Sequence, residues 1–347
     1  LGKALAGKMV NVFPYVSDLS EGISGAASPR DFETLMQLTY LYFTQPRMDQ
    51  DAFDTWKSGM KVALENALLD PMNSLRDTLN KLQTSNNPRG KQFNLDMLGK
   101  VDYSKAVSMY KERFANAGDF TFFITGNVNP DSIKGYVETY LGGLPSSKRR
   151  EVFVDRGIYP AQGVVKNHFG KKLETPKSTV VVIYSGKLEY TLENIILMNF
   201  LQGILDVVYT ENIREKEGGT YGVSVQGGLS KFPRERFSFF VQFDTDPAKR
   251  DKLLAIVHDE IKKVMEQNPS DANVQKVKEY MLKSRPEYLT DNSYWDGAIS
   301  TLLINGVDSH SDFEKVVSSV TPAMIRDFAQ KIFSQGNLIE VSMSPED

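Results

Sequence analysis

The sequence predicts an α+β fold made of two similar domains, each a mostly antiparallel sheet with helices packed on one face. Strand-like alternation of apolar residues is interspersed with long helical patterns along the 347 residues. Landmarks also recur at a constant offset of 218 residues, where Ser28, Pro29, Leu35 and Gly118 fall on Asp246, Pro247, Leu253 and Gly336. One helical pattern, at 192–214, is apolar on most of its circumference, so that helix must be mostly buried.

The first domain is expected to span residues 1–146. A strand pattern at Met9–Tyr15 comes first, and Ser28 followed by Pro29 marks the start of a helix that continues to about Thr44. The other elements expected here are helices from Asp49 past Ala67, from Pro71, at Tyr103–Phe114 and from Pro130 to Gly142, and a strand at Phe120–Thr125. The offset places the counterpart of the 192–214 helix before residue 1. We therefore expect this copy to lack its opening strands and helix, as a segment of a longer polypeptide would.

Residues 147–162 are expected to form a linker, because they show no sustained periodicity. The basic run Lys148–Arg150 within it is typical of a solvated surface. The second domain, 163–347, is expected to hold strands at Val164–Phe169, Ser178–Tyr184, Tyr221–Gly227, Phe237–Phe243 and Leu338–Ser342, with helices at 192–214, around 294–304, and from Pro247, Asp271 and Pro322. The continuous apolar run of the Ser178 strand is typical of a central position in its sheet.

Composition excludes several classes of function. The net charge is −3, with 41 basic and 44 acidic residues, so no strong field attracts nucleic acid or an anionic membrane. The chain has no cysteine, which rules out disulfides and thiolate chemistry and suits either cytoplasm or periplasm. No apolar run reaches the roughly 18 residues of a membrane span. Phosphate-binding loops, dinucleotide fingerprints and serine nucleophile elbows are also missing.

The stretch ENIREKEGGTYGVSVQ, residues 211–226, is the strongest candidate for a functional site. It places Arg214 on the last turn of the apolar helix and Tyr221 at the first position of a strand, seven residues later across a glycine turn. Both side chains donate hydrogen bonds, and peptide carbonyls suit them as acceptors. The alternative is structural: Arg214 caps the helix carbonyls and Tyr221 is a half-buried strand aromatic.

The pattern R-E-K-x-G-x-x-Y-x-V after a long apolar helix resembles the C-terminal half of bacterial zinc metallopeptidases of the pitrilysin/insulinase family, the inverzincins. Three further stretches resemble the same family: LAGKMVNVFPYVSDLSEGISGAASPRDFETLMQLTYLYFTQPRMDQDAF, YKERFANAGDFTFFITGNVNP and TPKSTVVVIYSG. The resemblance implies a metalloenzyme LuxS/pitrilysin-like fold, with 1–146 as an incomplete third family domain and 163–347 as the fourth. It also implies that Arg214 and Tyr221 bind substrate, because this half reaches across a closed chamber to the peptide.

The family's zinc motif, H-x-x-E-H, is absent from this sequence. The three histidines, His168, His258 and His310, are too far apart to form it, and no cysteine can substitute. We expect His258 on a solvated helix face, His168 in a strand or at its edge, and His310 in a serine-rich loop. The sequence therefore predicts no metal ligand and no catalytic residue in this stretch. The resemblance places zinc in the N-terminal half of the intact enzyme.

We predict the substrate-binding, non-catalytic half of a zinc-dependent endopeptidase that degrades peptides in a closed chamber. Its expected partners are a catalytic N-terminal half, fused or separate, and unfolded peptides, with no nucleic acid and no membrane span. The alternative is a catalytically silent peptide-binding or structural subunit that pairs with a separate active chain. The family resemblance favours the periplasm or cell envelope, with the cytoplasm as the alternative.

Overall fold

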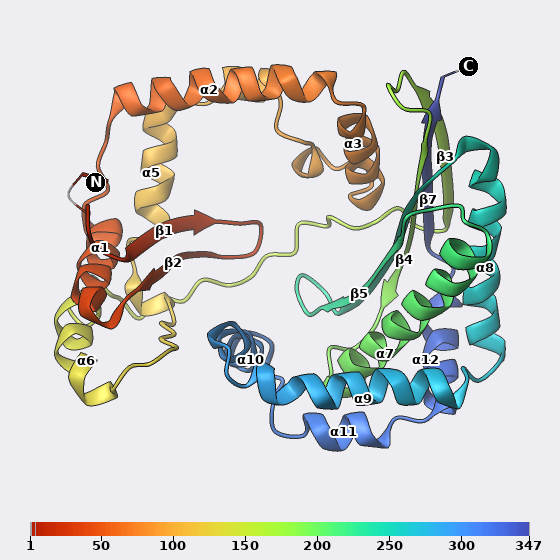
Figure 1. The fold of residues 1–347 in the computed structure, drawn as a ribbon. Coiled ribbons are helices and arrows are strands. Elements are labelled where there is room, and N and C mark those ends of the chain that lie inside the picture. The colour runs from red at the N-terminus through yellow and green to blue at the C-terminus, as the bar shows by residue number, and fades with distance from the viewer. Residues whose placement is uncertain (1, 4, 347) are drawn as a thin grey trace. The chain divides into compact units, whose positions relative to one another are not determined.

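The computed structural model describes residues 2–3 and 5–346, which divide between two units (Figure 1). Unit 1 holds the chain up to Glu65 together with Phe93–Val154, and unit 2 holds Asn66–Gln92 together with the chain from Asp155 onward. The boundary between Val154 and Asp155 falls within the expected linker at 147–162. The segment Asn66–Gln92, which lies inside the expected first domain, packs with unit 2.

Unit 1 combines a β-hairpin with helices. Its elements are β1 (Val10–Val16), β2 (Glu21–Ala27), α1 (Phe32–Thr44), most of α2 (Gln50–Leu69), α4 (Leu95–Gly99), α5 (Tyr103–Arg113) and α6 (Pro130–Tyr136), which continues as a π turn. β1 and β2 pair antiparallel, with Val10 opposite Ala27. β2 could not be predicted because its sequence, EGISGAA, lacks an alternation of large apolar residues. Aromatic rings on three segments form a core, since Phe43 lies 5.4 Å from Phe114 and 4.9 Å from Phe120 between ring centroids.

The strand predicted at Phe120–Thr125 does not form. Phe120 has an extended backbone, with φ −96° and ψ 150°, but residues 120–125 pair with no strand in the described part of the chain. The offset of 218 equates this segment with Leu338–Pro345, which pairs with two other strands in unit 2. Residues 120–125 have the apolar pattern of a strand, but no strand among the described residues lies beside them to pair with.

Unit 2 is built on a five-stranded sheet in the order β3-β7-β4-β6-β5 (Figure 1). The strands are β3 (Val164–Lys171), β4 (Ser178–Lys187), β5 (Val223–Ser230), β6 (Arg236–Thr245) and β7 (Leu338–Pro345). β4 is central, as its continuous apolar run predicted. Only the β3–β7 pairing is parallel among these strands, so the sheet is mostly antiparallel, as expected.

Helices cover both faces of this sheet. The helices of unit 2 are α3 (Pro71–Gln83), α7 (Leu192–Tyr209), α8 (Arg250–Glu266), α9 (Asp271–Tyr288), α10 (Asn292–Asn305), α11 (Phe313–Ser319) and α12 (Pro322–Phe333). α7, α8 and α12 lie on one side of the strands and α3 on the other (Figure 1). Along β4, Val180 and Val182 join the core under α7, whereas Val181 and Ile183 face Leu75 of α3. This double burial explains why β4 shows no polar alternation.

The predicted repeat extends to the order of the elements. An offset of 218 residues carries the 3₁₀ turn Pro29–Asp31 onto Pro247–Lys249, and the first residues of α1 and α4 onto those of α8 and α11. α2, α3 and α5 likewise correspond to α9, α10 and α12 within a few residues. The two halves of the chain thus run through the same succession of helices, although α3 packs with unit 2.

α7 is the buried helix that the sequence predicted. Nine of its residues are buried, among them Ile196, Phe200 and Leu201, each with no exposed surface. Together with the turn that follows, Leu192–Lys216 is the one described helix long and apolar enough to cross a membrane, with a mean hydropathy of 1.3. Half of that stretch is buried inside the protein and packs in the core of unit 2, as in the central helix of a globular fold.

Candidate functional site

The candidate site begins where α7 ends. The helix widens into a π turn at Thr210–Lys216, and Ile213, fully buried in the core, anchors this turn to unit 2. Single π turns within helices occur frequently at functional sites, because the extra residue re-aims the neighbouring side chains. Here the exposed side chain next to Ile213 is that of Arg214.

Two glycines turn the chain from the helix to β5. Gly218 has a φ of +54°, a conformation that suits glycine, and its N–H donates to the carbonyl of Arg214 at 3.1 Å. Gly219 packs against α8 so closely that an added Cβ would lie 2.6 Å from Leu253 Cδ1. The sequence therefore needs glycine at both positions for separate reasons, one conformational and one steric.

Tyr221 follows this turn and is 101% exposed. β5 begins at Val223, so the expectation that Tyr221 opens the strand is wrong by two residues. The structural alternative for Tyr221, a half-buried strand aromatic, is also wrong, since the ring touches no core. The two neighbours of Tyr221 are joined to each other, because the Thr220 hydroxyl donates to the Gly222 carbonyl and accepts from the Gly222 N–H.

The guanidinium of Arg214 and the hydroxyl of Tyr221 have no hydrogen-bond or ion-pair partner among residues 2–3 and 5–346. The guanidinium in particular bonds no carbonyl at the end of α7, which the structural alternative required. Unit 2 thus presents two long donors, at the two ends of one short turn, with their hydrogen bonds unmade. An acceptor-rich ligand such as an extended peptide backbone matches that chemistry.

The strand next to these donors is an edge of the sheet. β5 pairs only with β6, so its other side has no strand partner in the part of the chain described here. The N–H of Gly227, midway along β5, donates to Gln202 Oε1 of α7 at 3.0 Å. The beginning of β5, nearest Tyr221, is therefore the part of this edge best suited to pair with another extended chain.

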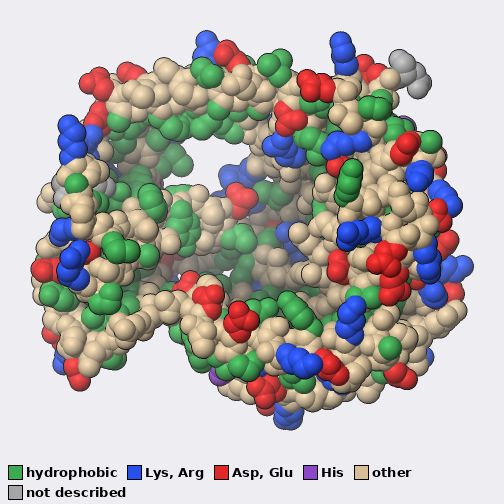
Figure 2. All heavy atoms as spheres, viewed as in Figure 1, with side chains coloured by type: hydrophobic (Ala, Val, Ile, Leu, Met, Phe, Trp, Pro, Cys, Tyr) green, Lys and Arg blue, Asp and Glu red, His purple; other side chains and the backbone are tan. Residues whose placement is uncertain are grey.

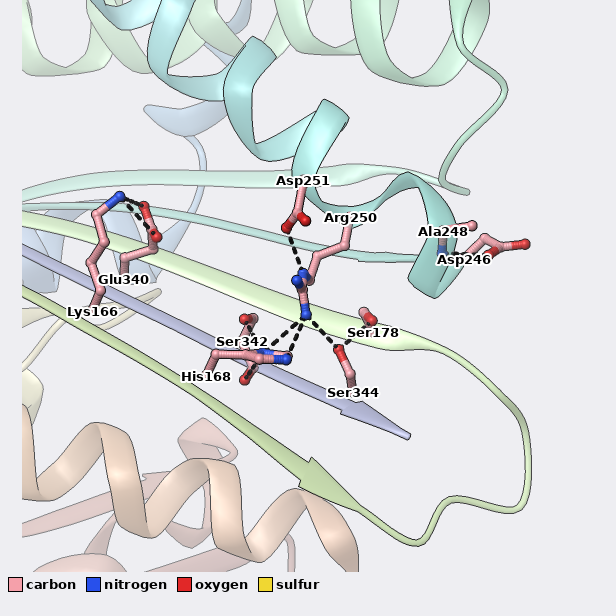
Figure 3. Close-up of polar contacts among 10 residues, drawn as sticks. All are labelled: Lys166, His168, Ser178, Asp246, Ala248, Arg250, Asp251, Glu340, Ser342 and Ser344. Atoms are coloured by element: carbon pink, nitrogen blue, oxygen red, sulfur yellow. Dashed lines mark hydrogen bonds and ion pairs between the residues drawn. The ribbon is translucent and has the colours of Figure 1, made fainter. Parts of the chain in front are cut away.

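The histidines lie away from this turn and contact other partners. His168 on the edge strand β3, as expected, accepts a hydrogen bond from Arg250 at 2.7 Å and contacts Ser342 Oγ at 2.8 Å (Figure 3). His310 precedes α11 and contacts the hydroxyl of Tyr294 at 2.8 Å. Within the described ranges no group of three or more His, Cys, Asp or Glu side chains is arranged to hold a metal ion.

His258 does not lie on a solvated face, so that expectation is wrong. It faces the sheet, where its Nε2 lies 2.7 Å from Glu340 and its Nδ1 lies 3.0 Å from the Tyr184 hydroxyl. The hydrogen bond from His258, assisted by Lys166, lowers the pKa of Glu340, while burial raises the pKa of Tyr184 to about 12. These groups form part of a polar row between α8 and the sheet.

Sequence reasoning missed this polar row, although β7 carries a signal for it. Ile339, Val341 and Met343 are apolar and alternate with Glu340, Ser342 and Ser344 on the opposite face. Arg250 reaches from α8 to Ser344 at 3.3 Å, and Ser344 in turn contacts Ser178 at 2.6 Å (Figure 3). The row satisfies buried polar atoms, since every buried side-chain N or O atom described has a partner.

Charge on the visible surface is mixed. Figure 2 shows acidic and basic side chains interspersed over this face, without a large area of one sign. Around Arg214, the acidic Glu211, Glu215 and Glu217 alternate with Lys216 in the same way. The turn therefore offers directed hydrogen bonds more than a strong field.

Comparison with known proteins identifies the family. Residues 100–281, just over half of the chain, match the family described as "Peptidase M16 inactive domain". The chain is 24% identical over 282 residues to the "Zinc protease PQQL-like" protein of Arabidopsis thaliana, covering 76% of this chain and 29% of that protein. It therefore spans less than a third of that relative's length.

Solved structures share the fold. The periplasmic protease PqqL of Escherichia coli superposes with a TM-score of 0.84 at 17% identity, over 99% of this chain and 38% of that one. The peptidase M16 inactive domain of Pseudomonas fluorescens superposes with a TM-score of 0.77 at 14% identity, over 99% of this chain and 82% of that one. The resemblance inferred from the sequence motifs is thus confirmed, and this chain belongs to the peptidase M16 inactive domain family.

Proposed function

We propose that this chain is the non-catalytic, substrate-binding half of a zinc-dependent endopeptidase, with Arg214 and Tyr221 as the groups that hold the peptide. The observation that carries the proposal is the pair of exposed donors without partners at the Gly218–Gly219 turn. A side chain with no structural partner and full exposure contributes little to folding. Its presence in this turn is better explained by a ligand.

The proposed binding mode uses the edge of β5. An unfolded peptide adds as a further strand beside the first residues of β5, and its backbone carbonyls near the cleaved bond accept from Arg214 and Tyr221. The Arg214 guanidinium is permanently charged, so its hydrogen bond to a carbonyl is charge-assisted and strengthens as negative charge develops on that oxygen. Recognition through the backbone accepts many sequences, which suits a peptide-degrading enzyme.

The catalytic step belongs elsewhere in this proposal. The described residues of this chain do not fit a zinc ion, because they offer no cluster of three ligands. We therefore assign zinc and the catalytic residues to an N-terminal half, which is fused to this chain or separate from it and which closes the chamber around the peptide. The periplasm is the proposed compartment, because a structural relative from Escherichia coli is a periplasmic protease.

A catalytically silent subunit that pairs with a separate active chain is the second candidate, because both proposals account for the missing H-x-x-E-H motif. The polypeptide encoded upstream of Leu1 separates the two. An H-x-x-E-H motif followed by a distant glutamate supports the fused enzyme, and an upstream region without that motif supports the silent subunit.

Peptide binding is the direct test. Fluorescence anisotropy of a labelled, unstructured peptide titrated with this chain should give a measurable Kd, which Arg214→Ala and Tyr221→Phe should each weaken by roughly tenfold, the effect of losing about 1.4 kcal/mol of hydrogen bonding. Arg156→Ala is the matched control, since Arg156 is also exposed and contacts no charged or polar partner in the described chain. Equal affinity in all four proteins would remove Arg214 and Tyr221 from the site.

A further inference from the structure

The turn between Arg214 and Tyr221 is fastened to unit 2 by two donors from outside it. The hydroxyl of Thr245, the last residue of β6, donates to the Gly219 carbonyl at 2.6 Å. The ammonium of Lys249, in the 3₁₀ turn that follows β6, donates to the carbonyls of Glu217 at 3.1 Å and Gly218 at 3.4 Å. Three consecutive carbonyls are thereby bound by side chains of one neighbouring segment.

These contacts are built into the core. Thr245 is 5% exposed, so its hydroxyl has no ready alternative partner in water, and Gly219 is buried beside it. The segment that carries both donors is also fixed, because Asp246 caps it by accepting from the Ala248 N–H at 2.8 Å. A buried hydroxyl bonded to a buried carbonyl determines where that carbonyl lies.

The contacts of Thr245 and Lys249 with the carbonyls of residues 217–219, together called the clamp, affect both proposed ligand-binding side chains. Gly219 lies two residues before Tyr221, and the Gly218 N–H donates to the carbonyl of Arg214 itself. Fixing residues 217–219 therefore fixes the separation of the two donors. A ligand that meets donors already in place does not have to order the turn, and this preorganisation increases its affinity.

We propose that Thr245 and Lys249 are positioning residues that hold Arg214 and Tyr221 at the spacing required by a peptide backbone. This inference rests on the proposed function, and it adds two residues that no sequence motif singled out. Neither residue touches the ligand. Both act through the Glu217–Gly219 turn.

Thr245→Val tests the clamp, because valine keeps the shape of threonine and removes the donor. The variant should bind the labelled peptide about 5- to 20-fold more weakly than the wild type, and its residues 218–222 should exchange amide hydrogens faster. Thr245→Ser restores the hydroxyl and should recover most of the affinity. Lys249→Met, which keeps the aliphatic stem, should produce a loss in the same direction.

A double-mutant cycle separates positioning from a general loss of stability. If Thr245 acts through Tyr221, Thr245→Val should have a clearly smaller effect on peptide affinity in a Tyr221→Phe background than in the wild type. The matched control is Ser342→Ala, which removes another buried hydroxyl of the same sheet, 2.8 Å from His168 Nδ1, on β7, which β4 separates from β6. That control should lower the melting temperature and leave the affinity of the folded protein unchanged.

The outcomes distinguish this inference from the proposed function. If Arg214→Ala and Tyr221→Phe weaken peptide binding but Thr245→Val does not, the positioning role alone is overturned. Equal losses of affinity from Thr245→Val and Ser342→Ala also overturn it, because the effect would then be one of stability. A wild-type chain without measurable peptide affinity overturns the proposed function and the positioning role together.

Discussion

Replacing Leu75 by alanine tests whether α3 completes unit 2. Leu75 is 2% exposed, and it packs against residues of two hydrogen-bonded strands, namely Val181, Ile183, Ile339, Val341 and Met343. Leucine-to-alanine changes in cores cost about 2–5 kcal/mol, with the larger values where the surroundings cannot collapse. Paired strands in the middle of a sheet move little, so we expect about 3–5 kcal/mol. For a unit of this size the melting temperature should fall by on the order of 10 °C.

Tryptophan fluorescence during urea unfolding can report on unit 2 alone. The chain has two tryptophans, Trp56 in unit 1 and Trp295 in unit 2, so a Trp56→Phe background leaves only the second. A probe confined to one unit is needed because two units need not unfold together. Leu69→Ala is the control, since Leu69 is 82% exposed and its truncation should cost almost nothing. If Leu75→Ala costs less than about 1 kcal/mol, or no more than Leu69→Ala, α3 does not cover this sheet.

Three further predictions follow from the site and from the polar row. In the intact enzyme, Arg214→Ala and Tyr221→Phe should each lower kcat/KM by roughly ten- to a thousandfold while the melting temperature moves only a few degrees; near-normal kcat/KM with a large thermal shift would show a structural role. This chain, treated with chelator and reloaded with zinc, should hold no stoichiometric zinc and hydrolyse no peptide, and one tightly bound zinc per chain in elemental analysis would refute that. Glu340→Gln should be destabilising at pH 7, because the folded pKa of Glu340 is lowered below 4.5 and the stabilisation is present above that value. The difference in melting temperature between Glu340→Gln and the wild type should shrink as pH falls from about 4.5 through the folded pKa, and a difference that does not change with pH would exclude the carboxylate as its source.

The sequence predicted the elements whose local pattern and packing agree. The central position of β4 and the burial of α7 both followed from apolar periodicity, because each is enclosed by its own unit. The segment Phe120–Thr125 shows the limit of that method, since its alternation is that of a strand but pairing depends on partners elsewhere. The short helix α11 was missed for a different reason: its serine-rich surroundings carry no helical period long enough to detect.

For the candidate site, the sequence predicted the two donors but not how they are held. The spacing of Arg214 and Tyr221 around a glycine pair could be read from the amino-acid sequence alone. The π turn, the full exposure of Tyr221 and the contact of Thr245 with Gly219 depend on how α7, β6 and α8 pack together. No local pattern distinguishes Thr245 from other threonines at strand ends.

The sheet order β3-β7-β4 has a consequence for how the protein is made. β7 is the last of the five strands of unit 2 to be synthesised, yet it lies between two strands that are synthesised much earlier. Until it arrives, β3 has no neighbour on the side that β7 will occupy, and the apolar face of α3 has only part of its sheet to cover. The sheet of unit 2 therefore cannot close before β7 is synthesised, and the nascent chain exposes an unpaired strand edge until then. Loss of β7 alone would therefore detach β3 from the sheet, so the removal of one strand has an effect beyond its own residues.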